Sequence, residues 1–593
     1  MLGRVLKLTT PHNISLFFIG LMFFLPFVIL RHEQPIPSFY PEWVAGLMGL
    51  LAIFALYSAK NWFVANASGG YFLKIPQISL VFIGLIAIVC LQWALGMLHS
   101  NQYALTIISY YAWAFLLVVL ASNLRHALGL EKLVSTLAWC LLVAGIINIG
   151  LAVLQFVVLT GGVIPFIPNL GGFGAIAQAN HFANFCALAT ASLIYLYAKG
   201  HFSLSMFRLL LVCFIVLLSV SGSRSVWLYL TAITILITMM RMKIVKAGDG
   251  DERLRGAWHA GLMLVPMFIV VQLLINYLVP NELVALPTER LINSVNEQSA
   301  SARLQFWHDS IRMFLLHPWL GVGAEKFRVA TFLLADSPTA LTSKYVFEHA
   351  HNLFLHLLAE MGIGAFLIIC AGLWVWLNAF KWQKLNLETW WIISLLAVLG
   401  IHSMLEYPLW YAFFLGIAAI LLGAGDERLI TFNLSTRLSN PFRLSLFLVL
   451  ILGLINLSTM LIAEIKLESW IQKVVYENTN DQRLLDWAKK SSSLSPYAER
   501  LSVMTLGNVY NHDTDEEVLQ HQSVMNFKPE EMVAYQLALL LELQGQHAKA
   551  IEQLHKSLSA YPEGFDRTLN TTPEKYKKIY LDLQLETQSN IGK

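Results

Sequence analysis

Charged residues are scarce in this chain of 593 residues. Asp, Glu, Lys and Arg make up 13% of it, whereas 57% is hydrophobic and the mean hydropathy is +0.60. A soluble protein carries roughly twice that charged share. The composition therefore excludes an ordinary soluble protein and predicts an all-α chain that crosses a membrane many times. The net charge of +3 gives no indication of nucleic-acid binding, and we expect none.

Cysteine is also rare, and its placement excludes two classes of site. The five cysteines all lie inside apolar runs and form no CxxC pair; they are Cys90, Cys140, Cys186, Cys213 and Cys370. Neither a disulfide framework nor a zinc site is indicated, so we interpret them as small buried hydrophobic residues.

Several catalytic motifs are missing. The sequence has no GxxxxGK[ST] phosphate loop, no GxGxxG after a strand, no GxSxG and no HExxH. Nucleotide, hydrolase-elbow and zinc-protease chemistry therefore have no support. The apolar runs also hold few internal charges, which argues against a proton-driven transporter.

Thirteen apolar runs of about 15–25 residues predict thirteen membrane spans. They cover residues 14–30, 43–58, 78–98, 103–122, 134–159, 181–198, 206–220, 225–241, 259–279, 352–378, 389–405, 408–424 and 443–463. No small-x-small cleavage site follows the first run, so we interpret it as a span and not as a signal peptide.

Lysine and arginine gather in alternate loops, which fixes an expected orientation. With a cytoplasmic N-terminus, the opposite short loops hold only Arg31 and Arg224. This topology places 160–180, 221–224, 280–351, the turn 406–407 and everything from 464 outside the cytoplasm. We expect four parts: a bundle of nine spans (1–279), a periplasmic loop (280–351), four more spans (352–463) and a soluble periplasmic domain (464–593).

The last 130 residues are rich in charge and helical in pattern. They hold 19 of the 37 acidic and 14 of the 40 basic residues. Ala538, Ala550, Leu554 and Pro562 fall at the spacing of small, apolar and terminal Pro positions in a tetratricopeptide repeat. We therefore expect helical hairpins of this kind.

The stretch EHAHN, Glu348 to Asn352, brings histidines to the mouth of the tenth span. On a helix His349 and His351 would point about 200° apart, so they share a target only if the backbone is extended. A neutral imidazole is the natural general base near neutral pH. No third ligand stands at zinc-like spacing, so we expect no metal. The alternative is a pair of interfacial polar residues flanking a span.

Two arginines are candidates for binding an anionic leaving group. Arg224 stands in SerGlySerArgSer between two short spans, and Arg303 in the long loop. An Arg at a span mouth is costly unless it is paired, and a lipid phosphate would pair it bidentately. The alternatives are snorkelling to headgroups for Arg224 and simple solvation for Arg303.

Further polar residues gather at the same expected face. Gln178, Asn180 and His181 end the glycine-rich stretch 171–181, and Tyr407 lies in the turn before the twelfth span. These side chains offer hydrogen bonds to a substrate, although a plain capped loop and an interfacial tyrosine belt would explain them as well.

Taken together, these motifs resemble the O-antigen ligase/polymerase superfamily. HisAsnLeuPheLeu…GluMetGlyIleGly (351–364) is similar to its His-Asn signature, and SerGlySerArgSer (221–225) and the segment 303–323 match other recurring parts. GlyAlaIleAlaGlnAlaAsnHisPheAla (174–183) resembles the N-terminal signature of the bacterial protein O-oligosaccharyltransferases, which glycosylate pilins and other exported proteins. The resemblance covers roughly residues 10–460.

The resemblance implies a GT-C-like fold and an inverting, metal-independent transfer, without cofactor, at the periplasmic face of the bacterial inner membrane. The donor would be an oligosaccharide on undecaprenyl pyrophosphate, and the acceptor a Ser or Thr hydroxyl of a pilin-like protein. His351 would be the base, with His349 as runner-up, and Arg224 and Arg303 would bind the pyrophosphate. Gln178, Tyr407, Asn180, His181 and Glu348 would orient the substrates.

Other functions stay open at this point. A ligase to lipid A core or a polysaccharide polymerase would use a sugar acceptor instead of a protein. A polytopic transporter would predict inverted repeats with broken helices, which the sequence does not show. A structural partner of a secretion or pilus machine would depend on the C-terminal region and not on the histidines.

Overall fold

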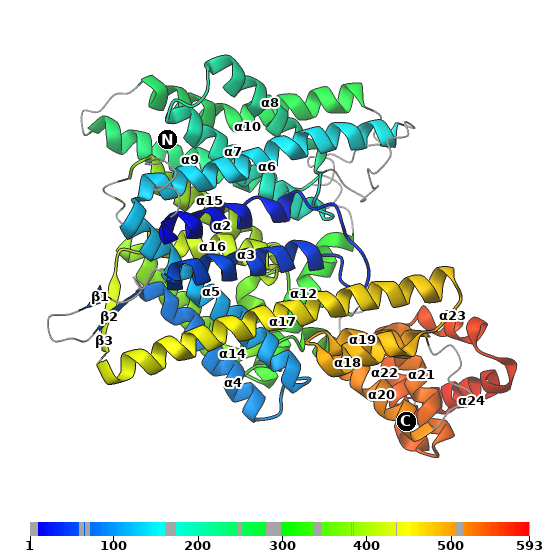
Figure 1. Ribbon diagram of the computed structural model, residues 1–593. Helices are drawn as coiled ribbons and strands as arrows, with labels where there is room; N and C mark the ends of the chain where they lie inside the picture. The colour runs from blue at the N-terminus through cyan, green and yellow to red at the C-terminus, as the bar shows by residue number, and fades with distance from the viewer. Residues whose placement is uncertain are drawn as a thin grey trace. The chain divides into compact units, whose positions relative to one another are not determined.

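The computed structural model describes residues 10–58, 64–65, 71–160, 174–246, 252–279, 298–336, 346–380, 382, 385–434, 436–505 and 514–591. Nearly all regular structure in these ranges is helical (Figure 1). The chain divides into two compact units. The first unit comprises 1–84, 109–298 and 368–457, and the second comprises 85–108, 299–367 and 458–593.

Among the described residues, nine α-helices, two short 3-10 helices and two short strands precede residue 280. They are α2 (Pro11–Met22), η1 (Leu25–Phe27), α3 (Phe39–Ser58), β1 (Val64–Ala65), β2 (Tyr71–Pro76), η2 (Gln77–Ser79), α4 (Leu80–Ala94), α5 (Asn101–Leu128), α6 (Leu130–Leu159), α7 (Ala179–Ala198), α8 (Leu204–Val220), α9 (Val226–Lys246) and α10 (Glu252–Leu278).

The remaining elements are again almost all helices. They are α12 (Gln298–Leu316), α13 (Phe327–Leu334), α14 (Leu353–Ala379), α15 (Leu387–Ser403), η4 (Pro408–Trp410), α16 (Ala412–Gly425), β3 (Leu429–Leu434), α17 (Thr436–Tyr476), α18 (Gln482–Ser491), α19 (Ser495–Thr505), α20 (Thr514–Phe527), α21 (Glu531–Leu543), α22 (His547–Ala560), α23 (Gly564–Thr571) and α24 (Glu574–Ile591).

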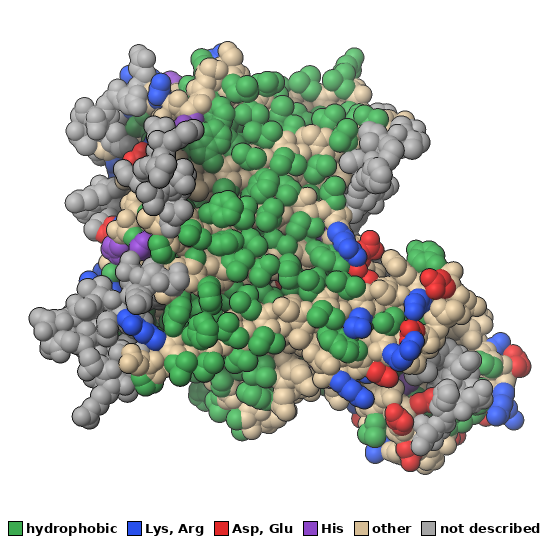
Figure 2. Space-filling model, viewed as in Figure 1, with side chains coloured by type: hydrophobic (Ala, Val, Ile, Leu, Met, Phe, Trp, Pro, Cys, Tyr) green, Lys and Arg blue, Asp and Glu red, His purple; other side chains and the backbone are tan. Residues whose placement is uncertain are grey.

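Nine helices of the described chain are long and apolar enough to cross a membrane: α3, α4, α5, α6, α7, α9, α10, α14 and α17. Four shorter apolar helices lie at 11–27, 204–220, 387–403 and 412–425. Every predicted run thus coincides with an apolar helix, which confirms a polytopic helical membrane protein; the count of thirteen spans stays a prediction. Figure 2 shows apolar side chains spread over the flanks of these helices, as contact with lipid requires.

Contacts in the first unit join helix ends that the sequence places on one side. At the expected cytoplasmic ends, Arg125 pairs with Glu427 at 2.6 Å and Lys199 with Glu388 at 2.6 Å. In the interior of α6, the Asn148 side chain donates to the Phe27 carbonyl at 2.7 Å. The two ion pairs therefore join loops that the sequence places on the same side of the membrane.

A three-stranded antiparallel sheet is the one part of the described structure that departs from the all-α expectation. Its order is β1-β2-β3, and Tyr71 pairs with Leu434 at one end of β2 and Pro76 with Leu429 at the other. The two loops that it joins both lie on the expected cytoplasmic side. Strand partners more than 350 residues apart leave no local signal in the sequence, so the periodicity alone misses the sheet.

Small residues let helices of the first unit approach closely. A Cβ on Gly423 of α16 would lie 2.2 Å from the Val118 carbonyl oxygen of α5, and one on Gly49 would lie 2.5 Å from Trp113 Nε1. Close approach through glycine is a usual way for membrane helices to gain van der Waals contact. At the centre of this unit, α7 is buried nearly all round, which places its N-terminal residues inside the bundle.

The second unit contains the C-terminal helices α18–α24 and the long loop around α12 and α13. Its core is formed by α20, α21, α22 and α24, and Ala538, Ala550 and Leu554 are fully buried in it. Antiparallel packing of α21 on α22 agrees with the expected helical hairpins, whereas the tetratricopeptide assignment stays a prediction. The four sequence-based domain boundaries likewise stay predictions; α17 runs without interruption from 436 to 476.

Candidate functional site

The segment 346–352, which carries the expected catalytic histidines, is irregular and leads directly into α14. Asn352 caps that helix: its side-chain oxygen accepts from the backbone N–H of Phe354 at 3.1 Å and of Leu355 at 3.2 Å. His351, just before the cap, has φ +50°. A non-glycine residue in the left-handed region costs of order 1 kcal/mol or more and persists only where surrounding contacts fix it.

The two histidines contact different partners. The His351 ring stacks on Phe306 of α12, with ring centroids 5.2 Å apart and an interplanar angle of 24°. The His349 ring lies 5.3 Å from that of His356 in the first turn of α14. The irregular backbone therefore sends neighbouring imidazoles in separate directions, and each can have its own role.

Arg303 belongs to the same unit as His351 and to the same helix as Phe306. It lies three residues before Phe306 on α12, and its side chain is partly exposed. Residues three apart on a helix share a face. Arg303 therefore lies on the side of α12 that carries Phe306, on which the His351 ring stacks.

Backbone hydrogen bonds fasten the loop HisProTrpLeuGlyValGly (317–323) to the start of α14. Val322 N–H donates to the Ala359 carbonyl at 2.9 Å, and Ile363 N–H donates to the Pro318 carbonyl at 2.9 Å. The Gln92 side chain reaches in to donate to the Glu360 carbonyl at 2.8 Å. Two separate motifs of the sequence are therefore one structural unit, with Gly362 at a kink in α14.

His356 and Glu360 form a buried pair whose role the sequence did not reveal. His356 Nε2 lies 3.1 Å from Glu360 Oε2, and both residues are under 5% exposed. The Glu360 carboxylate also accepts the backbone N–H groups of Glu325 and Phe327 at 2.9 and 3.0 Å, at the start of α13. The HisxxxGlu spacing, four residues apart on a helix, is the signal that would have predicted it.

The Glu348 carboxylate forms ion pairs with two cationic side chains of the protein. Its Oε1 lies 2.6 Å from Arg328 Nη1 of α13 and 2.5 Å from Lys528 Nζ, just after α20. Burial by itself would raise the pKa of Glu348, but Lys528 and Arg328 outweigh burial and lower the pKa below its ordinary value. The expected orienting role toward a substrate stays a prediction; the contacts show an ion-pair centre beside the histidines.

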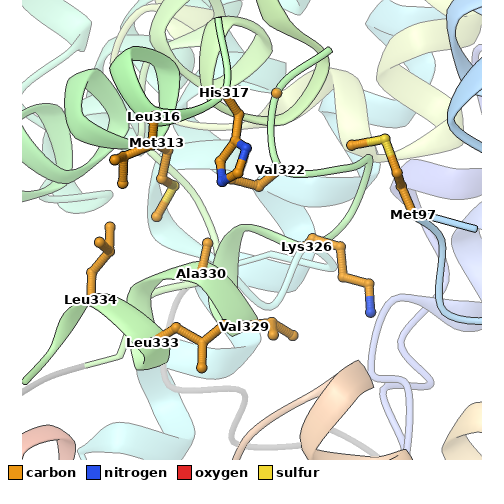
Figure 3. A pocket seen from close by; sticks show the side chains of 11 residues that line it. Met97, Met313, Leu316, His317, Val322, Lys326, Val329, Ala330, Leu333 and Leu334 are labelled. Carbon is orange, nitrogen blue, oxygen red and sulfur yellow. The ribbon is translucent and has the colours of Figure 1, made fainter. Parts of the chain in front are cut away.

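A cavity of about 380 Å³ lies in the second unit, between the end of α12 and α13. Its wall is mostly apolar, as Figure 3 shows for Met313, Leu316, Ala330 and Leu333. Neither His349 nor His351 lines it. Lys326, at its edge, donates to the Asn526 carbonyl at 2.5 Å, and burial lowers the pKa of this lysine to about 8.

In the first unit, the expected orienting residues come together at the start of α7. The Gln178 side chain caps the helix by accepting from His181 N–H at 2.6 Å. Asn180 Nδ2 donates to Glu406 Oε1 at 2.7 Å. His181 Nδ1 lies 2.8 Å from His402 Nε2, which extends the network into the bundle. Polar residues buried among apolar spans are a functional-site hypothesis by default.

Tyr407 lies beside this network, and Arg224 lies in the turn before α9. Tyr407 packs edge-on against the His181 ring at 5.9 Å. Arg224 is partly exposed in the turn before α9, five residues from Tyr229, whose hydroxyl lies 2.7 Å from His402 Nδ1. The sequence missed His402 and Glu406 because their partners lie more than 200 residues away.

In the described ranges, no group of three or more His, Cys, Asp or Glu side chains is arranged to hold a metal ion. The histidines of the two candidate clusters make ring contacts and hydrogen bonds. A neutral imidazole can act as a general base.

Comparison with known proteins places these residues in a family. The family model for O-antigen ligase matches residues 209–370, which include Arg224, Arg303, Glu348, His349 and His351. The model for the C-terminal part of a virulence factor membrane-bound polymerase matches residues 390–573.

Two relatives come from Acinetobacter baylyi. The chain is 25% identical to a general O-oligosaccharyltransferase over 361 residues, 59% of this chain and 61% of that one, so less than two thirds of that relative is matched. It is 24% identical to a ComP-specific O-oligosaccharyltransferase over 441 residues, 73% and 74% of the two chains. These matches confirm the resemblance predicted from the sequence: the chain is similar to the O-antigen ligase family over 209–370 and to two protein O-oligosaccharyltransferases over 59% and 73% of its length.

Proposed function

We propose that this protein transfers an oligosaccharide from a lipid pyrophosphate to a hydroxyl group of an acceptor protein. The observation that carries the proposal is the O-antigen ligase match over 209–370, because it contains both arginines and both histidines that the chemistry needs. The contact of His351 with Phe306, one turn from Arg303, supports it in the second unit.

In the proposed step, His351 accepts the proton of a Ser or Thr hydroxyl while its oxygen attacks the anomeric carbon of the donor sugar. The bond from that carbon to the pyrophosphate oxygen breaks, and the lipid pyrophosphate leaves with the bonding electron pair. A single displacement inverts the configuration at the anomeric carbon. His349, whose ring lies 5.3 Å from that of His356, is the runner-up base.

The leaving group gains negative charge as the bond breaks, and a guanidinium can stabilise that charge bidentately. We assign this work to Arg303 and Arg224. The polar network of Gln178, Asn180, His181 and Tyr407 would orient donor or acceptor. The assignment of each role comes from the sequence.

The finer features of the function are also proposals. The donor lipid would be undecaprenol, the acceptor a pilin-like exported protein, and the reaction face the periplasmic side of the bacterial inner membrane. Thirteen spans from a cytoplasmic N-terminus would put the histidine segment and the C-terminal helices on that side. The C-terminal helices would then be placed to meet a folded acceptor.

A second candidate is a polysaccharide polymerase, in which the acceptor is the hydroxyl of another glycan. The match of residues 390–573 to a membrane-bound polymerase model favours it. Both candidates use the same base and leaving group and differ only in the acceptor.

The test is an assay with the full-length protein in proteoliposomes, an undecaprenyl-pyrophosphate oligosaccharide and a purified pilin. Intact-mass measurement should show pilin gaining the mass of one glycan. Longer glycan chains on the lipid without any pilin adduct would overturn the proposal in favour of the polymerase. A mass gain in the absence of the lipid-linked donor would contradict the proposed donor chemistry.

A further inference from the structure

The long loop before the histidines is built into the core of the C-terminal helices. Phe332 of α13 is 3% exposed and belongs to the same buried cluster as Val533, Leu540 and Leu554. Its ring lies 6.1 Å from that of Tyr561. The loop and the C-terminal helices therefore share one hydrophobic core, and disturbing one side disturbs the other.

One short turn of the C-terminal helices makes most of the polar contacts to this loop. It comprises residues 526–529, at the C-terminal end of α20 and just after it. The Asn526 carbonyl accepts from Lys326 at 2.5 Å, the Pro529 carbonyl accepts from Arg328 Nε at 2.9 Å, and Lys528 pairs with Glu348. Two hydrogen bonds and one ion pair thus connect this turn to Lys326, Arg328 and Glu348 of the loop.

The turn itself is well anchored. The Tyr561 hydroxyl donates to the same Pro529 carbonyl at 2.9 Å, and Arg500 pairs with Glu530 at 2.6 Å. The Phe527 ring packs edge-on against Tyr103 at 5.5 Å and Tyr497 at 5.4 Å. Because these contacts fix the turn in place, a change at the turn would also displace the loop residues that bind to it.

Glu348 connects this turn to the histidine segment. Its carboxylate joins Lys528 to Arg328, and the next residue along the chain is His349. On the preceding side, the Phe347 carbonyl accepts from Thr331 Oγ1 at 3.0 Å. The strained His351 lies three residues on, so the Glu348 contacts are among those that hold its backbone in an unfavourable region.

We propose that Lys528 and Arg328 are positioning residues, which hold Glu348 and thereby fix the histidine segment in its catalytic geometry. The C-terminal helices then support the active site directly, in addition to any docking of an acceptor. This inference rests on the proposed function, in which His351 is the base. It assigns to Glu348 an ion-pair role within the protein.

The experiment compares Lys528→Gln and Lys528→Glu with the conservative Lys528→Arg, all in the full-length protein in proteoliposomes. Lys528→Gln removes the charge and keeps the apolar stem of the side chain. We expect kcat to fall roughly 10- to 100-fold in the first two, since small misplacement of a catalytic group costs that much. KM for donor and acceptor should stay within about twofold, and Lys528→Arg should retain most of kcat.

A matched control removes a lysine of similar exposure from the same helices. Lys577 pairs with Glu574 at 2.9 Å and is 33% exposed, against 28% for Lys528. Lys577→Gln should leave kcat unchanged. A thermal melt of each variant shows whether the fold is retained.

A second measurement does not depend on activity. Hydrogen exchange of the backbone amides in residues 346–352 should be faster in Lys528→Gln and Lys528→Glu than in the wild type and in Lys577→Gln. Faster exchange together with the loss in kcat supports the proposal. Unchanged hydrogen exchange in residues 346–352 would overturn the proposal. A raised KM for the acceptor with unchanged kcat would also overturn it and would indicate that Lys528 helps to dock the acceptor.

Failure of the proposed function looks different. In that case the wild-type protein transfers no glycan to protein at all, while the exchange measurement still shows whether Lys528 holds the segment.

Discussion

The backbone kink of α14 can be tested with two glycines of one motif, because only one of them has a backbone conformation that requires glycine. In MetGlyIleGly (361–364), Gly362 has φ +70° and ψ −169°, a region that only glycine adopts readily. Gly364, two residues on, is helical. The perturbation is the same at both positions: Gly362→Ala and Gly364→Ala.

The magnitudes follow from what an added Cβ would meet. At Gly362 it would lie 2.3 Å from the Trp319 carbonyl oxygen and 2.7 Å from the Leu320 nitrogen, both backbone atoms that cannot move alone. Backbone strain of ~1–3 kcal/mol adds to this clash, so we expect a loss of roughly 3 kcal/mol or more. At Gly364 the nearest atom is Ile88 Cδ1 at 3.5 Å, an ordinary contact. Alanine there should be neutral or stabilise by about 0.5–1 kcal/mol.

The assay is thermal unfolding of the purified protein in detergent, together with glycan transfer. Gly362→Ala should melt at lower temperature and lose transfer, because the loop 317–323 that holds α14 must shift and the histidine segment shifts with it. Gly364→Ala should melt at or above the wild-type temperature and stay active. Equal melting of the two variants would refute the reasoning.

Four further results are expected. Arg303→Lys should lower kcat by about 10- to 100-fold, since one charge-assisted hydrogen bond of the bidentate pair is lost; full activity would indicate simple solvation. Glu348→Gln should lower the melting temperature at pH 7. Because the pKa of Glu348 is lower in the folded protein, its ionised carboxylate stabilises the fold at pH values above the ordinary pKa of 4.5. This stabilisation is lost as the pH falls through the lowered pKa, so the melting temperatures of wild type and variant should converge in acid. A difference in melting temperature that persists at acid pH would show that the charge of Glu348 is not responsible. Asn180→Leu should destabilise by about 1–3 kcal/mol, because it removes a hydrogen bond from buried Glu406; an unchanged melt would exclude this. Treatment with EDTA should leave transfer unchanged, and loss that is restored by a divalent metal would contradict the metal-free mechanism.

Much of the fold could be predicted from the sequence because lipid imposes a simple rule. A span must be helical and apolar over about 20 residues, and composition alone reports this. The expected runs therefore coincide with helices. The pairing of β2 with β3 could not be predicted from the sequence, because its register, Tyr71 with Leu434, exists only after the chain has folded.

The sequence allowed residues to be proposed for the candidate site, but it did not report how they are arranged. Local motifs pointed to His351, Arg303 and Gln178, and the capping of α14 by the residue after His351 follows from local spacing. Ring stacking of His351 on Phe306 and the ion pair of Glu348 with Lys528 depend on contacts between distant segments. No period or spacing in the sequence reports them.

His349 and His351 offer the most direct comparison within the site. They stand two residues apart, and the His351 ring stacks on Phe306 of the helix that carries Arg303. The central claim is that the imidazole of His351 accepts the proton of the acceptor hydroxyl as the lipid pyrophosphate leaves.

The measurement that tests this claim is the initial rate of glycan transfer by His351→Ala and His349→Ala in the same proteoliposome assay, at matched protein content. We predict that His351→Ala lowers kcat by about 10²- to 10⁴-fold with little change in donor KM, as the loss of a general base does. We predict a smaller loss for His349→Ala. A rate for His351→Ala near that of the wild type would contradict the account.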